Sequence, residues 1–343
     1  MKDVRPAAYR SLLLIATLLL AACSSGGSAA LSPPAATVPP ALSASPGAAP
    51  TATTQALTPP PSPPYAIAAL RLRPHQAGSL AVGGLLATGP GYTKRKVTWP
   101  SMGAVMTGVI GVPTGRGPFP VVVVNHGYVP AGQYYVGQDS SKYADPLASQ
   151  GFLTVSPNYP GYAGSGPGEA DVPPIVAEAI SDIDLISALA TLPGADPSRV
   201  AVAGHSNGGG VSLILLAADS RVRAAVLYAP VSSDMADNAR KWWVRTDGGT
   251  GPLGSPDADP AAYAAMSPRG NLPQMGPPTL VMQGSADEQI PAAWTAATVA
   301  ALQAAAIRTQ FVSFPGALHN FVGVDLVHAN ALAAAWLRSA MRS

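Results

Sequence analysis

One serine in this chain lies in a setting that could make it a nucleophile. Ser206 is the centre of G-H-S-N-G at residues 204–208, a G-x-S-x-G pentapeptide. An apolar, β-branched run at 200–203 predicts a strand before it, and an apolar run at 211–218 predicts a helix after it. A strand, a tight turn and a helix form the context in which this pentapeptide holds a reactive serine at the end of a sheet. The alternative is a glycine-rich turn that carries an idle serine.

A serine hydroxyl needs a base to become a nucleophile at neutral pH. The sequence contains five histidines, and His319 is the predicted base because it follows the last predicted strand, 309–314, in F-P-G-A-L-H-N-F. His205 adjoins the nucleophile, and neighbouring side chains of such a turn are expected to point elsewhere. The remaining histidines receive no catalytic role: His75, His126 and His328.

The base in turn needs a carboxylate that fixes its tautomer and stabilises the imidazolium. Asp287 follows the predicted strand 278–283, and Glu288 beside it is the second candidate. Asp325 lies close to the final predicted helix, where we expect it to cap that helix. The chain order is therefore serine, aspartate, histidine.

Acyl transfer also needs donors that are arranged in advance for the developing oxyanion. The first predicted donor is the backbone N–H of Asn207, at the start of the helix after the nucleophile. The second is predicted in the loop that follows P-V-V-V-V-N-H-G at 120–127, and Tyr128 is the residue we name there. A tyrosine that only lines the pocket is the alternative for this position.

Strands and helices must alternate to bring these residues together. The predicted strands lie at 94–99, 104–112, 120–125, 152–156, 200–203, 223–228, 278–283 and 309–314. The predicted helices lie at 140–150, 173–192, 211–218, 292–306 and 326–341. This alternation predicts an α/β fold with a mostly parallel sheet of about eight strands and helices on both faces. Residues 65–90 are ambiguous, and 231–272 read as a lid-like insertion. Ligands of such sheets bind beyond the carboxyl ends of the strands, where every candidate residue falls.

Taken together, these segments resemble the α/β-hydrolase superfamily. The resemblance rests on P-V-V-V-V-N-H-G-Y, on the loop G-F-L-T-V-S-P-N-Y-P-G-Y-A-G-S-G, on V-A-G-H-S-N-G-G, on P-P-T-L-V-M-Q-G-S-A-D-E-Q-I-P and on F-P-G-A-L-H-N-F. They cover residues 93–341 in the right order and are most similar to the prolyl oligopeptidase catalytic domain and its dienelactone hydrolase-like relatives. The resemblance implies an α/β-hydrolase fold and a Ser206–His319–Asp287 triad. It does not specify the substrate.

The resemblance leaves esterase and peptidase readings open. Prolyl peptidases usually carry a β-propeller, which needs far more chain than the segment before the first predicted strand. Pro160 stands where their usual loop arginine is expected, and no acidic pair is evident for a peptide amino terminus. These departures favour hydrolysis of carboxylic esters through an acyl-enzyme. A serine peptidase of the prolyl oligopeptidase type is the alternative, and a non-catalytic surface binding protein is the third reading.

The net charge and the cysteine content exclude several classes of partner and cofactor. The formal net charge of +2 on 343 residues, without a basic cluster, argues against a nucleic-acid partner. The single cysteine, Cys23, excludes an intrachain disulfide and a thiolate metal site. Asp257 and Asp259 are better read as turn residues than as metal ligands. We therefore expect no metal and no cofactor, and a small ester or a short peptide as substrate.

The amino terminus has the features of an export signal. Basic residues precede an apolar run at 12–22 that is too short for a permanent membrane span, and the run ends in L-A-A-C at Cys23. This ending is similar to a bacterial lipobox, which implies cleavage before Cys23 and its acylation. We expect a lipoprotein signal peptide at 1–22, an Ala/Pro/Ser-rich disordered tether at 23–64 and a catalytic domain at 65–343. The expected location is the cell envelope, with the protein exported and anchored to a membrane by lipid.

Overall fold

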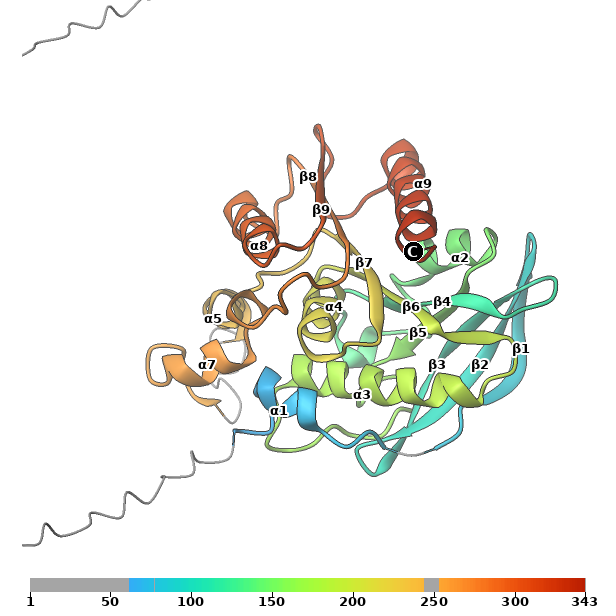
Figure 1. The fold of residues 1–343 in the computed structure, drawn as a ribbon, viewed down its shortest axis with the longest axis horizontal. Helices are drawn as coiled ribbons and strands as arrows, with labels where there is room; N and C mark the ends of the chain where they lie inside the picture. The colour runs from blue at the N-terminus through green and yellow to red at the C-terminus, as the bar shows by residue number, and fades with distance from the viewer. Residues whose placement is uncertain (1–61, 77, 244–252, 343) are drawn as a thin grey trace, which may run out of the picture. The chain divides into compact units, whose positions relative to one another are not determined.

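The structure is a computed structural model, and it describes residues 62–76, 78–243 and 253–342 (Figure 1). The predicted signal peptide, most of the tether and the acylated Cys23 lie outside the described residues. Residues 59–343 form one compact unit. Within the described ranges, no helix is long and apolar enough to cross a bilayer.

A twisted sheet of nine strands runs through this unit, in the order β1-β2-β3-β5-β4-β6-β7-β8-β9. The first four strands of this order pair antiparallel, and every later pair, from β5–β4 to β8–β9, is parallel. The strands are β1 (Ala81–Gly89), β2 (Tyr92–Ser101), β3 (Ala104–Pro113), β4 (Phe119–Asn125), β5 (Leu153–Asn158), β6 (Ala195–His205), β7 (Val222–Tyr228), β8 (Thr279–Gly284) and β9 (Thr309–Phe314). The sheet is thus mostly parallel, as the sequence predicts.

Helices cover both faces of the sheet (Figure 1). They are α1 (Ile67–Leu72), α2 (Ser141–Ala148), α3 (Pro174–Ala188), α4 (Asn207–Ala218), α5 (Met235–Asn238), α7 (Pro260–Met266), α8 (Ala292–Ala304) and α9 (Gly323–Ala340). One core cluster packs between the sheet and α1, α3, α4 and α8, and the other lies between the sheet and α2 and α9. This two-layer burial accounts for the continuous apolar strands of the sequence.

Strand β4 shows how the sequence specifies this arrangement. Its valines are all buried; Val121 and Val123 join the first core cluster, whereas Val122 and Val124 join the second. A side-chain period of two sends alternate residues to opposite faces, so a buried central strand must be apolar throughout. The same alternation holds along β6, which carries the nucleophile candidate at its end.

Strand β1 corrects the predicted count of about eight strands. It lies in the segment that we left ambiguous, and all of its residues except the last are exposed. It pairs only with β2, with two register irregularities, so it is an edge strand. An edge strand without a buried face shows no alternation of apolar and polar residues, and this explains why the sequence did not reveal it. Residues 94–96 lie on β2, between β1 and β3.

The segment predicted as an insertion, 231–272, lies between β7 and β8. Its described part consists of α5, a π-helical turn at Ala239–Trp243, α7 and a 3-10 turn at Pro268–Gly270. Asp259 caps α7 by accepting the N–H of Ala262, as a turn residue should, and Asp257 pairs with Arg240. Residues 244–252 lie outside the described residues. The lid role of the segment stays a prediction.

Candidate active site

The nucleophile candidate lies in the turn between β6 and α4. Ser206 has φ 55° and ψ −118°, a backbone conformation that residues other than glycine rarely adopt. Its N–H donates to the carbonyl of Tyr228 at 3.0 Å, and its own carbonyl accepts N–H groups of Gly209, Gly210 and Val231 at 2.9, 3.2 and 3.1 Å. Four backbone hydrogen bonds thus hold the serine in a strained position at the carboxyl end of the sheet.

The two glycines of the pentapeptide are required by close backbone contacts. A Cβ on Gly204 would lie 2.1 Å from the carbonyl oxygen of Gly208, and a Cβ on Gly208 would lie 2.3 Å from that of Asn125. Both are backbone oxygens, which cannot move aside as a flexible side chain could. The G-x-S-x-G spacing is therefore what allows the turn, the helix and β4 to approach each other.

The structure brings the predicted base and its predicted carboxylate into contact. His319 follows β9 and Asp287 follows β8, and His319 Nδ1 lies 3.1 Å from Asp287 Oδ2, with both side chains almost fully buried. The other Asp287 oxygen accepts the N–H groups of Gln289 and Ile290 at 2.9 and 2.8 Å. Burial acts to raise the pKa of Asp287, but the His319 contact and these N–H donors hold it below its usual value. Asp287 is therefore an ionised partner for an imidazolium.

Glu288, the second candidate, has a different contact. Its carboxylate accepts the backbone N–H of His319 at 3.1 Å and does not reach the ring. Asp325 is not a helix cap: it lies in the first turn of α9, whose N-cap is Val322 with no side-chain hydrogen bond. A negative charge in the first turn still complements the helix dipole.

Ser206 and His319 share one pocket of about 580 Å³. Within the described residues, the Ser206 hydroxyl makes no hydrogen bond. Such bonds often form only when substrate is bound, so the arrangement is compatible with catalysis. The lining residues combine an apolar wall with polar groups: Gly127, Tyr128, Val129, Gln138, Asp139, Lys142, His205, Ser206, Asn207, Val231, Trp242, Trp243, Gln289, His319 and Asn320.

The two predicted oxyanion donors border the same pocket. In the part of the chain that the structure describes, the N–H groups of Tyr128 and Asn207 have no hydrogen-bond acceptor. Asn207 is the first residue of α4, so its N–H lies at the positive end of the helix dipole. The Tyr128 side chain is 72% exposed, so its backbone is the part suited to this role.

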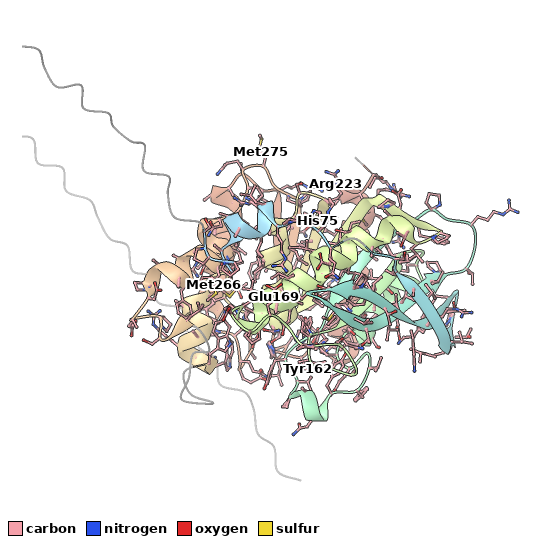
Figure 2. All side chains as sticks on the ribbon, turned by 90° about the horizontal axis from the view of Figure 1, so that it is seen from below. His75, Tyr162, Glu169, Arg223, Met266 and Met275 are labelled. Atoms are coloured by element: carbon pink, nitrogen blue, oxygen red, sulfur yellow. The ribbon has the colours of Figure 1, made fainter. Side chains whose placement is uncertain are left out.

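Two tyrosines after β5 hold the loop that carries Tyr128. The Tyr159 hydroxyl donates to the carbonyl of His126 at 2.8 Å, and the Tyr162 hydroxyl donates to that of Val129 at 2.9 Å; Figure 2 labels Tyr162. The His126 ring stacks on Tyr159, and burial lowers the pKa of His126 to about 4, so this ring is neutral. Carbonyls on both sides of Tyr128 are thereby fixed, which restrains the direction of its N–H.

A buried carboxylate accepts a hydrogen bond from the side chain of Asn207, the first oxyanion donor. Asn207 Nδ2 donates to Glu178 Oε2 at 2.8 Å, and Glu178 lies on α3, where it is 7% exposed. Burial raises the pKa of Glu178 to about 8, although the Asn207 contact opposes this shift. The apolar periodicity of 173–192 predicted the helix but gave no reason to single out this carboxyl group.

The raised pKa makes a stability prediction. Protonation of Glu178 favours the folded state, so its contribution is complete below about pH 4.5 and is lost as the pH rises to about 8. A neutral Glu178→Gln variant avoids this loss. Its free energy of unfolding, relative to wild type, should increase by about 1.4 kcal/mol per pH unit within that window. Urea unfolding between pH 5 and 9 measures the increase.

The control for this variant is Glu169→Gln, at a surface carboxylate that pairs with Arg73 and is labelled in Figure 2. It should show no comparable increase. A constant difference between Glu178→Gln and wild type across the range would contradict the assignment of a buried, protonated Glu178.

The structure corrects the prediction for His205. Its ring does not point away from the pocket but lines it, with Nδ1 2.8 Å from Asp139 Oδ2. The predicted site also lacks Asp139, which lies in a loop, and Lys142, which lies in the short helix α2. Neither segment carries a distinctive motif. Among the described residues, no group of three or more histidine, cysteine or acidic side chains could hold a metal ion.

These features define a class: an α/β-hydrolase fold whose nucleophile turn, histidine and aspartate meet at the carboxyl end of the sheet. Residues 138–343 match the prolyl oligopeptidase family, and the chain belongs to this family. The family and the fold are those of serine hydrolases, which include both esterases and peptidases.

Solved structures with the same fold include proteins named for both activities. The acetyl xylan esterase of Paenibacillus sp. R4 has a TM-score of 0.59 and 19% identity, over 80% of this chain and 92% of that one. Dipeptidyl peptidase 4 of Porphyromonas gingivalis has a TM-score of 0.55 and 19% identity, over 73% of this chain and 36% of that one. At these identities the likeness shows the fold alone.

A curated relative matches part of the chain. An uncharacterized protein of Pseudomonas aeruginosa is 37% identical over 92 residues, which are 26% of this chain. The match covers 24% of that relative's length, so it indicates kinship over a short segment and no activity.

Proposed function

We propose that this chain hydrolyses carboxylic esters through an acyl-enzyme on Ser206. The observation that carries the proposal is the buried His319–Asp287 pair, which shares a pocket with a strained serine and two N–H groups without acceptors. Each part is one that acyl transfer requires. No part has another evident structural purpose in the described residues.

The geometry supports the following sequence of steps. The Ser206 hydroxyl attacks the ester carbonyl while His319 takes its proton, and Asp287 holds Nδ1–H and balances the charge of the imidazolium. The N–H groups of Asn207 and Tyr128 stabilise the oxyanion. His319 then gives its proton to the leaving alcohol, and a water molecule, deprotonated by His319, releases the acid and restores the serine.

The lining of the pocket supports an ester substrate over a peptide. Val231, Trp242 and Trp243 offer an apolar wall for an acyl or alcohol group. Among the described residues that line the pocket, the one carboxylate is Asp139, and it is already paired with Lys142 and His205. A carboxylate so paired is poorly suited to bind the free amino terminus that an exopeptidase recognises.

A substrate comparison tests this function. The purified protein is assayed with p-nitrophenyl acetate and butyrate and with alanyl and prolyl p-nitroanilides. We expect kcat/KM for the esters to exceed that for the anilides by about 100-fold or more, a difference of about 2.7 kcal/mol in transition-state stabilisation. Comparable rates would favour a prolyl oligopeptidase-type peptidase. No turnover of either class by folded protein would favour the non-catalytic binding reading.

We further propose that the protein is exported and held at a membrane by lipid on Cys23. The support comes from sequence: basic residues, an apolar run at 12–22 and the ending L-A-A-C before the single cysteine. Several acyl chains would anchor the protein firmly, since each buried methylene contributes about 0.8 kcal/mol. Cys23→Ala should move the protein from the membrane fraction to the soluble fraction. An unchanged distribution of that variant would refute the anchor.

A further inference from the structure

Asp139 contacts the loops of two catalytic parts and is connected to a third through His205. Its Oδ2 accepts the N–H of Gly127 at 2.6 Å and lies 2.8 Å from Nδ1 of His205. Gly127 directly precedes the oxyanion donor Tyr128, and His205 directly precedes the nucleophile Ser206. One carboxylate oxygen therefore joins the end of β4 to the end of β6, one residue away from the reacting groups.

The third connection runs through the His205 ring. Its Nε2 lies 3.2 Å from the carbonyl oxygen of His319, and the two histidine rings are 4.8 Å apart. Both nitrogens of His205 thus face acceptors, one a carboxylate and the other a carbonyl. Both contacts are hydrogen bonds only when the ring carries two protons.

Charged and aromatic groups surround His205. Asp139 is the carboxylate that contacts it, Lys142 pairs with the other Asp139 oxygen at 2.8 Å, and the Tyr143 ring lies 5.6 Å away on α2. Burial acts to raise the pKa of Asp139, but the charges and hydrogen bonds of His205 and Lys142 hold it well below its usual value. Asp139 is thus an ionised acceptor for the Nδ1–H of His205.

The backbone of Asp139 adds an independent observation. Its φ is 63°, in the left-handed region that costs energy for residues other than glycine, although aspartate and asparagine tolerate it best. In this conformation the carboxylate of Asp139 is directed toward the pocket. Backbone strain at such a position persists only when the surrounding structure maintains it, and strained residues of this kind cluster at functional sites.

We propose that Asp139 and His205 form a second aspartate–histidine pair that positions the oxyanion loop, the nucleophile and the base relative to one another. The proposal rests on the proposed function for its kinetic consequences but not for its structural ones. Asp139 and His205 touch no reacting atom in this account, so they are positioning residues. Their effect is on kcat, because misplacement of reacting groups lowers the rate more than it lowers binding.

The test uses Asp139→Asn in the full chain, because asparagine keeps the shape and tolerates the same φ. We expect kcat for p-nitrophenyl butyrate to fall about tenfold to a hundredfold, with KM changed less than about threefold. A merely structural role would lower thermal stability without this separation of kcat from KM.

A spectroscopic measurement tests the pair without substrate. In protein labelled with ¹⁵N-histidine, the His205 Nδ1–H signal of wild type should shift in Asp139→Asn, because its acceptor changes from a carboxylate to an amide, and His205→Gln identifies the resonance. An identical signal in both proteins, or a kcat within twofold of wild type, would overturn the proposal. If wild type hydrolyses nothing, the proposed function fails while the spectrum still decides on the pair.

Asp219→Asn is the matched control. Asp219 is also a buried carboxylate in an ion pair, with Arg221, but it lies after α4 at the other end of that helix from Ser206. Its loss should lower thermal stability and leave kcat and the His205 Nδ1–H signal unchanged. A similar change in both variants would mean that the loss at Asp139 reflects general destabilisation, and this too would overturn the proposal.

Discussion

Ser206→Ala is expected to reduce kcat for ester hydrolysis about a millionfold, the cost of removing the nucleophile of an acyl-transfer triad. The hydroxyl makes no hydrogen bond within the described residues, and the elbow is held by backbone contacts, so removal of the oxygen leaves the fold intact. The measurement is kcat with p-nitrophenyl butyrate, alongside circular dichroism and thermal unfolding.

Ser198→Ala is the control for this variant. Ser198 lies on the same strand, β6, near its amino end, and its hydroxyl contacts only Asp196. It should keep the wild-type rate. If Ser206→Ala retained more than about a hundredth of the wild-type rate, the nucleophile assignment would be wrong, because residual catalysis from binding and oxyanion donors alone is far smaller.

Asp287→Asn should reduce kcat about ten-thousandfold while the fold is retained. The asparagine side chain can present its amide to His319 Nδ1, which then accepts a hydrogen bond and leaves Nε2 protonated. A base in this tautomer cannot take the serine proton. The neighbouring Glu288→Gln should cost less than about tenfold, because Glu288 accepts hydrogen bonds from the backbone N–H of His319 and from Gln289 but none from the His319 ring, and one such bond contributes about 1 kcal/mol.

The two variants separate the two carboxylates that the sequence left open. Equal losses, or a larger loss in Glu288→Gln, would show that Glu288 orients the base in solution. The pKa of Asp287 lies below its usual value, so its charge is present throughout the neutral range. We therefore expect the loss in Asp287→Asn to be the same throughout that range.

Local patterns were enough to predict the centre of the fold, and they also single out the three residues that we propose as the triad. The valine run of β4, the pentapeptide at 204–208 and the strands before Asp287 and His319 each carry their signal within a few residues. Because parallel strands end at one edge of a sheet, the chain order alone placed these side chains together.

The contacts that the sequence did not reveal depend on segments far apart in the chain. Asp139 meets His205 across 66 residues, and Glu178 meets Asn207 across 29. Neither carboxylate belongs to a repeating pattern, and Asp139 lies in a loop whose left-handed φ no motif announces. The direction of the His205 side chain likewise depends on its acceptors and not on its place in the turn. Such partners become visible only when the three-dimensional fold is known.

The central claim is that Ser206 is an activated nucleophile, and covalent labelling tests it most directly. The purified protein is treated with a fluorophosphonate probe, digested and mapped by mass spectrometry, with Ser206→Ala in parallel. The account predicts one adduct, on Ser206, which is absent from the variant. A folded wild-type protein that takes no label, or a label that persists in Ser206→Ala, would contradict it.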